Sequence, residues 1–596
     1  MSDYVAPLKE MRFVVERLCG LEMLRPIPEF AETTSDVVDA VLAEAARLAG
    51  EVIGPLNRIG DTAGVRLVDD VAHTPPGWRE AYGAFVDGGW NGLSCDPEFG
   101  GQGLPKLIAT AVGEMWNAAN LAFALGPMLT QGAVDAIVQH ASEALKALYL
   151  PRMISGAWTG TMNLTEPQAG SDLSAVRTRA LPEGGHFRIT GQKIFITYGE
   201  HDLTENIIHL VLARLPDAPA GTRGISLFIV PKFLVGDDGS LGPRNDVRCV
   251  SLEHKLGIHG SPTAVMAYGE KGGAIGHLVG EPNRGLEYMF TMMNAARHAV
   301  GVEGMALGER AYQRAAKFAR ERVQGRPVGY AGKAGTIVEH ADVRRMLMTM
   351  RAYVEAMRAL AYVCALAFDV GATHPDRALR EAARRRGDLL TPIVKGWCTE
   401  TGNRVTSLGV QIHGGMGYIE ETGAAQHFRD ARITTIYEGT TGIQAADLVG
   451  RKTLRDGGAA ARELIAAMKA DAAALDAAVE PRLAAIASAL HAGIAALERV
   501  LAWLFAAERE DPRLPLAVSV HYLELWGVVA GGWLMAKAAA IADAELAGGA
   551  ADRPFFEAKL GTAHFYAVQI MPAAAMLEPV ITMGAAATFA LEAEAL

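Results

Sequence analysis

Residues 206–231 read NIIHLVLARLPDAPAGTRGISLFIVP and hold two apolar runs separated by a segment rich in Pro, Gly and Asp. Both runs are short and dominated by Ile, Leu, Val and Phe, and the segment between them is a turn signal, which is typical of successive β-strands. HFRITG (186–191) and TAVMAYG (263–269) have the same character. Residues 161–280 therefore predict a β domain of the barrel or sandwich type.

Apolar residues recur at helical spacing on both sides of this β region. VVDAVLAEAARLAGEVIGPLN (37–57) and LIATAVGEMWNAANLAFALGPML (107–129) predict an N-terminal helical domain. Long helical patterns return at 285–322, and two more cover roughly 337–370 and 376–411, which predicts a helical bundle. The expected fold class is therefore multi-domain and mainly α, with a β domain in the middle.

The domain organisation follows from these patterns and from the chain length. A chain of 596 residues is too long for one hydrophobic core. Residues 455–459, RDGGA, read as a linker before an Ala-rich helical stretch. We expect an N-terminal extension, an α-helical domain, the β domain, a four-helix bundle and an additional C-terminal helical domain, at residues 1–34, 35–160, 161–280, 281–455 and 456–596.

Composition and charge exclude several classes of function. The net charge is −11, and residues 460–596 alone carry 9 Lys/Arg against 16 Asp/Glu, which disfavours nucleic acid as a partner. Five widely spaced cysteines without a CxxC pair indicate neither a disulfide framework nor a metal site. The N-terminus lacks a signal-peptide core, and charges interrupt the Ala-rich segments. We expect a cytoplasmic protein without a membrane span.

Two segments of the β region have the character of a ligand site. MNLTEPQAGSDLSAVRT (162–178) is a turn-prone run in which hydroxyls and backbone N–H groups are available to a flavin ring or a phosphate. GQKIFITYG (191–199) places Phe195 and Thr197 two residues apart, on one face of a strand, where they could flank a planar ring. A phenylalanine in such a pattern is more often part of the core, so neither segment decides the function alone.

HGGMGY (413–418) is a Gly-rich turn after a predicted helix. It permits close backbone approach to a ligand or to another chain. The segment does not match GxGxxG at the start of a helix after a strand, and the sequence has no P-loop. A Rossmann-type nicotinamide enzyme is therefore disfavoured.

RITTIYEGTTGIQAADLVGRK (432–452) contains the strongest candidate for a catalytic group. Glu438 lies between apolar residues and a Gly-Thr-Thr sequence that precedes an amphipathic helix. Apolar surroundings raise the pKa of a carboxyl group and make it a usable base near neutral pH. Two plainer interpretations stay open at this point: a solvated loop glutamate, and a pattern explained by Thr440 or Thr441 as a helix cap.

Six segments in order resemble the acyl-CoA dehydrogenase family, and the resemblance runs from about residue 35 to 455. They are PEFGGQGLP (97–105), LTEPQAGSD (164–172), GQKIFITYG (191–199), KLGIHGSPTA (255–264), QIHGGMGY (411–418) and IYEGTTGIQ (436–444). The N-terminal YVAPLKEMRFV, the GRPVG sequence and the extra helices after residue 455 resemble the long-form branch that includes 3-methylmercaptopropionyl-CoA dehydrogenases.

The resemblance implies FAD as the cofactor and assigns roles to individual residues. Contacts to the isoalloxazine and pyrophosphate fall on Leu164, Thr165, Ser171, Phe195, Thr197 and Thr440. Positions that reach the FAD of a neighbouring subunit are Arg322, Gln324, Gln411, Gly414 and Gly415. In shorter relatives a second dimer packs onto the first to give a tetramer, and the extra C-terminal helical domain would cover that surface, so we expect a homodimer. Substrate contacts fall on Ser171, Arg297 and Gly439. The family's usual Thr-Phe after the FAD arginine is absent, because Arg322 is followed by Val323 and Gln324.

The resemblance also implies the reaction. Glu438 would remove the α-proton of an acyl-CoA, flavin N5 would take the β-hydride, and an electron-transferring flavoprotein would be the acceptor. Some relatives carry the base near Arg297, but MMNAARHAVG (292–301) has no carboxylate. The branch favours 3-(methylthio)propanoyl-CoA or a short-to-medium acyl-CoA. The alternatives are an acyl-CoA oxidase and a DNA-binding flavoprotein relative, which the acidic C-terminal region disfavours.

Overall fold

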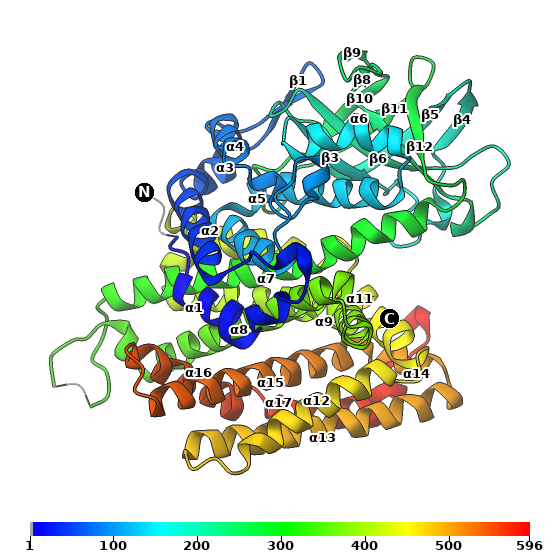
Figure 1. Ribbon diagram of the computed structural model, residues 1–596. Coiled ribbons are helices and arrows are strands. Elements are labelled where there is room, and N and C mark those ends of the chain that lie inside the picture. The colour runs from blue at the N-terminus through cyan, green and yellow to red at the C-terminus, as the bar shows by residue number, and fades with distance from the viewer. Residues whose placement is uncertain (1–3, 330, 596) are drawn as a thin grey trace. The chain divides into compact units, whose positions relative to one another are not determined.

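The structure is a computed structural model that describes residues 4–329 and 331–595, and the chain forms two compact units. Unit 1 comprises residues 4–6, 44–105 and 115–299. Unit 2 comprises residues 7–43, 106–114 and 300–595. Two long helices, α5 (Lys106–His140) and α7 (Gly285–Glu321), contribute residues to both units. Each unit is described by itself (Figure 1).

Unit 1 is built on an eight-stranded sheet within the described part of the chain. Its strands run in the order β10-β11-β5-β12-β7-β6-β3, and β4 pairs with β5. Only the β3–β6 pair is parallel among these pairings; the others are antiparallel. The strands are β3 (Trp158–Asn163), β4 (Arg179–Glu183), β5 (His186–Thr197), β6 (Asn206–Ala213), β7 (Ser226–Pro231), β10 (Val247–Leu252), β11 (Thr263–Tyr268) and β12 (Ala274–Val279).

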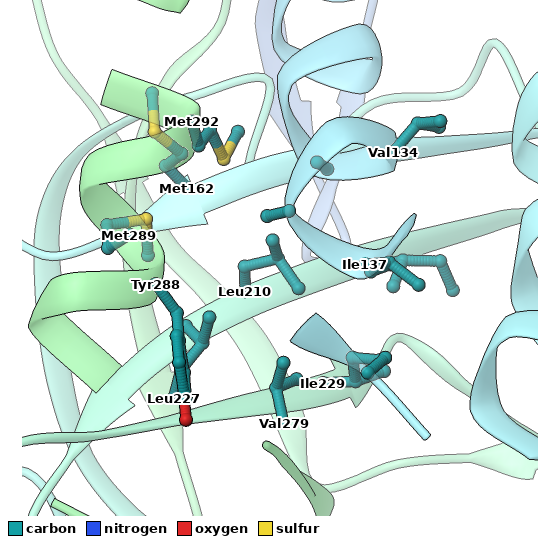
Figure 2. Close-up of a cluster of buried hydrophobic side chains, with 14 of the residues drawn as sticks. Val134, Ile137, Met162, Leu210, Leu227, Ile229, Val279, Tyr288, Met289 and Met292 are labelled. Atoms are coloured by element: carbon teal, nitrogen blue, oxygen red, sulfur yellow. The ribbon is translucent and has the colours of Figure 1, made fainter. Parts of the chain in front are cut away.

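Helices cover one face of this sheet and enclose a continuous apolar core. Strands β6 and β7 are buried along their whole length, which explains why their sequences are nearly uninterrupted apolar runs. Figure 2 shows Leu210, Leu227 and Ile229 of the strands facing Ile137 of α5 and Met289 of α7. Unit 1 also contains helices α3 (Leu56–Ala63), α4 (Trp78–Asp87) and α6 (Glu143–Ile154).

Unit 2 is helical. Helices α8 (Ala341–Thr373) and α9 (Arg377–His413) pack against each other over much of their length. Unit 2 also contains residues 35–43 of α2 (Ser35–Leu48) and the helices α10 (Ala424–Ala431), α11 (Thr441–Val449), α12 (Ala459–Leu475), α13 (Pro481–Glu510), α15 (Ser519–Ala547), α16 (Arg553–Gln569) and α17 (Ala573–Gly584). The predicted fold class, with helical, β and then helical regions, is confirmed.

Helix α15 is the centre of unit 2. It contacts α8, α9, α11, α12, α13, α16 and α17, and Figure 1 shows it beside α16. Its small residues let neighbours approach closely: a Cβ at Gly527 would lie 2.0 Å from Cγ of Trp397 on α9. The sequence signal is a run of apolar and small residues on every side of the helix, as expected for a helix buried all round.

Two groups of buried charges also hold unit 2 together. Arg358 of α8 pairs with Glu114 of α5 at 2.6 Å and with Glu309 of α7 at 2.8 Å. Lys559 of α16 pairs with Glu10 and Glu355, both at 2.7 Å. Since an unpaired charge is costly to bury, these pairs fix how the helices meet.

Long apolar helices are a general feature of the chain. Five of the described helical segments are long and apolar enough to cross a membrane by length and composition alone. In three of them, Lys106–His140, Ala341–Thr373 and Ser519–Ala547, most of the apolar window is buried inside the protein. The five cysteines are buried thiols that form no disulfide.

We predict that Gly527→Ala lowers the free energy of unfolding by roughly 1–3 kcal/mol, because the added methyl group overpacks the contact with Trp397. The control is Gly561→Ala in α16, where a Cβ would meet nothing within 4 Å. There the better helix propensity of alanine should raise stability by up to roughly 1 kcal/mol. Urea denaturation measures the free energy of unfolding of both variants. Equal effects of the two substitutions would contradict the close packing of Gly527 against Trp397.

Candidate active site

The residues predicted to form the site are divided between the two units. Unit 1 contains six of them: Leu164, Thr165, Ser171, Phe195, Thr197 and Arg297. Unit 2 contains eight: Arg322, Gln324, Gln411, Gly414, Gly415, Glu438, Gly439 and Thr440. Each group is therefore built up from its own unit.

In unit 1, the loop after β3 is held in place by the buried carboxylate of Glu166. One oxygen accepts hydrogen bonds from the Thr178 hydroxyl at 2.6 Å and the Lys193 ammonium at 2.8 Å. The other accepts from Gln168 Nε2 at 2.6 Å and the Arg177 backbone N–H at 2.8 Å. These bonds tie both ends of the 164–178 loop to one side chain.

The backbone of Leu164 and Thr165 is fixed by β5. Lys193 Nζ donates to the Leu164 carbonyl at 2.9 Å, and the Ile194 N–H donates to the Thr165 carbonyl at 2.9 Å. Both residues are partly exposed, and Ser171 is exposed farther along the loop. The loop thus offers partly accessible backbone and hydroxyl groups on a rigid support.

Strand β5 carries a bulge at the predicted aromatic position. Its pairing with β11 moves from Lys193↔Met266 to Ile196↔Ala264, so the strand has an extra residue there. Phe195 has φ 60°, and its ring is 59% exposed, whereas Ile196 is buried. Bulges re-aim side chains next to functional sites. Alternation along the sequence predicts neither the bulge nor the left-handed backbone.

The last predicted residue of unit 1, Arg297, is buried on α7 at 4% exposure. A buried guanidinium is unusual unless it is paired or faces a ligand. Its neighbour His298 is buried as well.

In unit 2, Glu438 lies in a turn between a 3-10 segment, Arg432–Thr435, and helix α11. Its φ is 54° and that of Gly439 is 92°, so two consecutive residues adopt the left-handed region. For a glutamate this conformation costs on the order of 1–3 kcal/mol and is found mostly at functional sites. A Cβ at position 439 would lie 2.6 Å from Nε2 of Gln444, which explains the glycine.

Buried donors stabilise this strained turn. Lys395 of α9, at 0% exposure, donates to the Gly439 carbonyl at 2.6 Å. Gln444 of α11, also at 0% exposure, donates from Nε2 to the carbonyls of Glu438 at 3.2 Å and Gly439 at 3.3 Å. Both peptide groups after Glu438 are therefore fixed in direction.

Helix α11 begins directly after the turn and is capped by it. The Thr440 hydroxyl accepts from the Ile443 N–H at 3.3 Å, while the Thr441 hydroxyl donates to Glu400 of α9 at 2.6 Å. Of the two possible caps, Thr440 is the one that forms. The cap accounts for Thr440 but not for the left-handed backbone of Glu438.

The remaining predicted positions lie at the far end of α9. Gln411 is near its C-terminus, and Gly414 and Gly415 begin the following 3-10 segment, where an added Cβ would meet nothing within 4 Å. Gln411 is 16 residues after Lys395, roughly 24 Å along an α-helix. Within this unit, the 411–415 positions are therefore distant from the Glu438 turn.

Arg322 and Gln324 lie at the same end of the bundle as Gly414. The Phe318 ring of α7 stacks on His413 with centroids 4.4 Å apart. Four residues later, the Arg322 carbonyl accepts from the Ile337 N–H at 2.8 Å, and the Gln324 N–H donates to the Gly335 carbonyl at 3.1 Å. The Arg322–Gln324 backbone is therefore paired with that of residues 335–337.

Family models match nearly the whole chain. The acyl-CoA dehydrogenase N-terminal, middle and C-terminal domains match residues 62–157, 161–268 and 283–453. A fourth model, the acetyl-CoA dehydrogenase C-terminal-like domain, matches residues 463–592. A curated relative, 3-methylmercaptopropionyl-CoA dehydrogenase of Ruegeria pomeroyi, is 51% identical over 95% of this chain and 96% of its own. The chain belongs to the acyl-CoA dehydrogenase family.

Other relatives agree with this assignment. Butyryl-CoA dehydrogenase of Syntrophomonas wolfei is 33% identical over 96% of this chain and 95% of its own length. The solved structure of an acyl-CoA dehydrogenase from Bacillus anthracis complexed with FAD superposes with a TM-score of 0.73 at 19% identity, covering 94% of this chain and 90% of that one. The latter likeness establishes the fold.

Several residues that support the site of this acyl-CoA dehydrogenase were not identified from the sequence. They are Glu166, Lys193, Lys395 and Gln444, and each is buried. In the sequence they are ordinary polar residues within strands and helices. The sequence indicates such residues only weakly, by placing a polar or charged residue where the helical or strand pattern calls for an apolar one.

We predict that Glu166→Gln lowers the free energy of unfolding by roughly 3–5 kcal/mol, because it leaves the buried Lys193 ammonium without a counter-charge. The double variant Glu166→Gln/Lys193→Met should recover part of this loss. The control is Glu183→Gln, which breaks an exposed ion pair with Arg188 and should leave the melting temperature unchanged. Equal destabilisation by both single substitutions would contradict the role of burial.

The same carboxylate makes stability depend on pH. Burial alone would raise the pKa of Glu166, but the Lys193 charge and the hydrogen bonds from Thr178 and Arg177 lower it to about 2. Because the folded-state pKa lies below the unfolded one, the contribution is complete above about pH 4.5 and is lost as the pH falls towards 2. The pH dependence of unfolding in this range should be shallower in Glu166→Gln.

Proposed function

We propose that this member of the family catalyses FAD-dependent α,β-dehydrogenation of an acyl-CoA thioester, with Glu438 as the base that removes the α-proton. The observation that carries this proposal is the turn at Glu438, where a left-handed glutamate is stabilised by two fully buried donors. Such strain is retained where a side chain must be held in one direction. A solvated loop glutamate would need neither Lys395 nor Gln444.

The residues available for FAD fit its chemistry. Leu164, Thr165, Ser171 and Thr197 supply neutral backbone and hydroxyl groups of the kind that bond an isoalloxazine ring, and the exposed Phe195 offers an apolar face. Arg322 and Gln324 would suit the anionic and adenine portions, and Gly414 and Gly415 leave room for close approach. Thr440 is assigned to the flavin as well. When bound, FAD supplies the acceptor for the β-hydride at N5.

Glu438 needs its charged form and a fixed direction to act as the base. The hydrogen bonds from Gln444 and Lys395 orient the two peptide groups that follow it and so restrict the turn that carries its side chain. The Glu438 N–H, on the preceding peptide group, would donate to the thioester carbonyl. One preorganised donor of this type is worth roughly 3–4 kcal/mol in oxyanion holes. The proton taken from the α-carbon would reside on a Glu438 carboxylate oxygen.

For the substrate we propose 3-(methylthio)propanoyl-CoA, which is oxidised to the methylthioacryloyl thioester. The support is the full-length identity of 51% with the Ruegeria pomeroyi enzyme. Arg297, Ser171 and Gly439 are the proposed substrate contacts. A panel of acyl-CoAs of graded length plus the methylthio compound, with an artificial acceptor, tests this preference, and a higher kcat/KM for butanoyl-CoA or longer chains would overturn it.

We predict that Glu438→Gln retains FAD but bleaches the flavin at least about a hundredfold more slowly on anaerobic addition of acyl-CoA, because the amide cannot accept the proton. Flavin content per chain and stopped-flow absorbance measure the two properties. Glu421→Gln, a substitution of an exposed glutamate on a neighbouring segment, is the control. Bleaching of Glu438→Gln at the rate of the control would refute the assignment.

The electron acceptor distinguishes a dehydrogenase from an oxidase. We propose an electron-transferring flavoprotein in the cytoplasm. Reduction of such a flavoprotein without oxygen consumption would support the dehydrogenase, whereas oxygen uptake coupled to acyl-CoA oxidation would favour the oxidase.

We propose a homodimer, in which Arg322, Gln324, Gln411, Gly414 and Gly415 serve the FAD of the other chain. The distance along α9 supports this arrangement. Lys395 contacts the Glu438 turn, whereas Gln411 lies roughly 24 Å farther along the same helix, so the 411–415 positions are placed to serve a different FAD from the one beside Glu438. The helices after residue 456 pack on α8 and α9 and so cover surface that a second dimer would otherwise use. Light scattering should give twice the chain mass of 63.2 kDa, and a tetrameric mass would contradict the proposal.

A further inference from the structure

A second carboxylate lies beneath the Glu438 turn. Glu303 on α7 has 0% exposure, and its Oε2 accepts a hydrogen bond from the hydroxyl of Tyr437. Its other oxygen, Oε1, has no hydrogen-bond partner among the described residues. A buried carboxylate that is only half satisfied is costly unless it is neutral or has a function.

Tyr437 connects this carboxylate directly to the proposed base. It immediately precedes Glu438, and its N–H donates to the Ile433 carbonyl at 3.2 Å, so the backbone before the base is held by the preceding 3-10 segment. The backbone after the base is held by Lys395 and Gln444. Glu303 therefore fixes the Tyr437 side chain, which precedes the base, whereas Lys395 and Gln444 bond to the carbonyls of Glu438 and Gly439.

We propose that Glu303 is a positioning residue for the reaction, which acts through its hydrogen bond with Tyr437 to hold the Glu438 turn. This inference rests on the proposed function, because it takes Glu438 as the base. Glu303 is not assigned contact with substrate or cofactor.

The charges around Glu303 support a neutral carboxyl group at pH 7. Burial is the main cause that raises the pKa of Glu303, the Tyr437 hydrogen bond and the Lys395 ammonium oppose the rise, and the charge of Glu438 adds to it, so that the resulting pKa is about 8. The groups that act on it are thus Tyr437 and Glu438 of the turn and Lys395 of α9, with Asp430 of α10 acting on Tyr437. One proton on Glu303 removes the repulsion between two neighbouring carboxylates.

Ionisation of Glu303 should therefore slow catalysis at alkaline pH. A second negative charge near Glu438 opposes the negative charge that develops on the thioester oxygen as the proton leaves. At pH 9, one unit above a pKa of about 8, about a tenth of Glu303 stays protonated, so the rate of flavin bleaching should fall to about a tenth of its plateau.

The experiment compares three variants of the holoenzyme by stopped-flow bleaching between pH 6 and 10. Glu303→Gln keeps the size and the acceptor for Tyr437 but cannot ionise, so it should retain the plateau rate and lose the alkaline decline. Glu303→Ala removes the acceptor and should lower the rate at least about tenfold at unchanged flavin content. Tyr437→Phe should resemble Glu303→Ala, and combining the two should add little further loss.

The matched control is Asp369→Asn. Asp369 is another buried carboxylate of unit 2 whose pKa burial raises, here to about 7, but it caps the start of α5 through the N–H groups of Lys106 and Leu107. Asparagine also caps helices well. This variant should keep the alkaline decline, because Asp369 is not part of the Glu438 turn.

A second measurement does not depend on activity. The folded protein retains a proton on Glu303 that the unfolded chain releases above about pH 4.5, so the carboxyl group weakens folding progressively up to about pH 8. The melting temperature of Glu303→Gln should therefore exceed that of the wild type by an amount that grows over this pH range. A constant difference would overturn the neutral state of Glu303.

The outcomes separate this inference from the proposed function. An alkaline decline that persists in Glu303→Gln, while Glu438→Gln is inactive, overturns the role of Glu303 alone. Loss of bleaching at pH 7 in Glu303→Gln would make Glu303 the base and also overturn its positioning role. Full activity of Glu438→Gln would refute the proposed function and, with it, this inference.

Discussion

Burial of the central part of α9 is the constraint on which unit 2 depends. The Trp397 ring packs directly against Gly527 of α15, and this contact sets the position of α15 along α9. Lys395, two residues before Trp397 on α9, donates to the Gly439 carbonyl. Glu400, about one and a half turns after Lys395 on the same helix, accepts from the Thr441 hydroxyl. A single rigid helix thus sets both the packing of the bundle and the position of the Glu438 turn.

The Glu438 turn combines a strained backbone with a buried charged donor. A left-handed glutamate and a fully buried ammonium each cost free energy in isolation. The ammonium is offset by the Gly439 carbonyl, which the left-handed backbone directs towards it, so the two unfavourable features stabilise each other. A relaxed turn would lose this arrangement, since its carbonyls would point elsewhere.

The fold class was predictable because burial leaves a direct trace in residue order: apolar runs in β6 and β7, and helical spacing in α7, α8 and α9. The candidate positions came from motifs and from family resemblance, and Thr440 was one of two possible caps. Other features had no local signal. The bulge at Phe195 depends on pairing with β11. The importance of Glu303 follows only from its hydrogen bond with Tyr437, which is 134 residues away in the sequence. Contacts of that sequence separation are decided by tertiary structure.

The hydrogen bonds of Glu166 affect the entropic cost of binding a ligand at the 164–178 loop. Because one carboxylate joins the start of the 164–178 loop to its end and to Lys193 of β5, the conformational entropy of ordering the loop is lost when the chain folds. A ligand that docks on this loop would not have to supply that ordering free energy from its own contacts. The binding free energy of such a ligand would then come from its contacts without a deduction for ordering the loop. The loop would be preformed for binding, with fast association and little rearrangement.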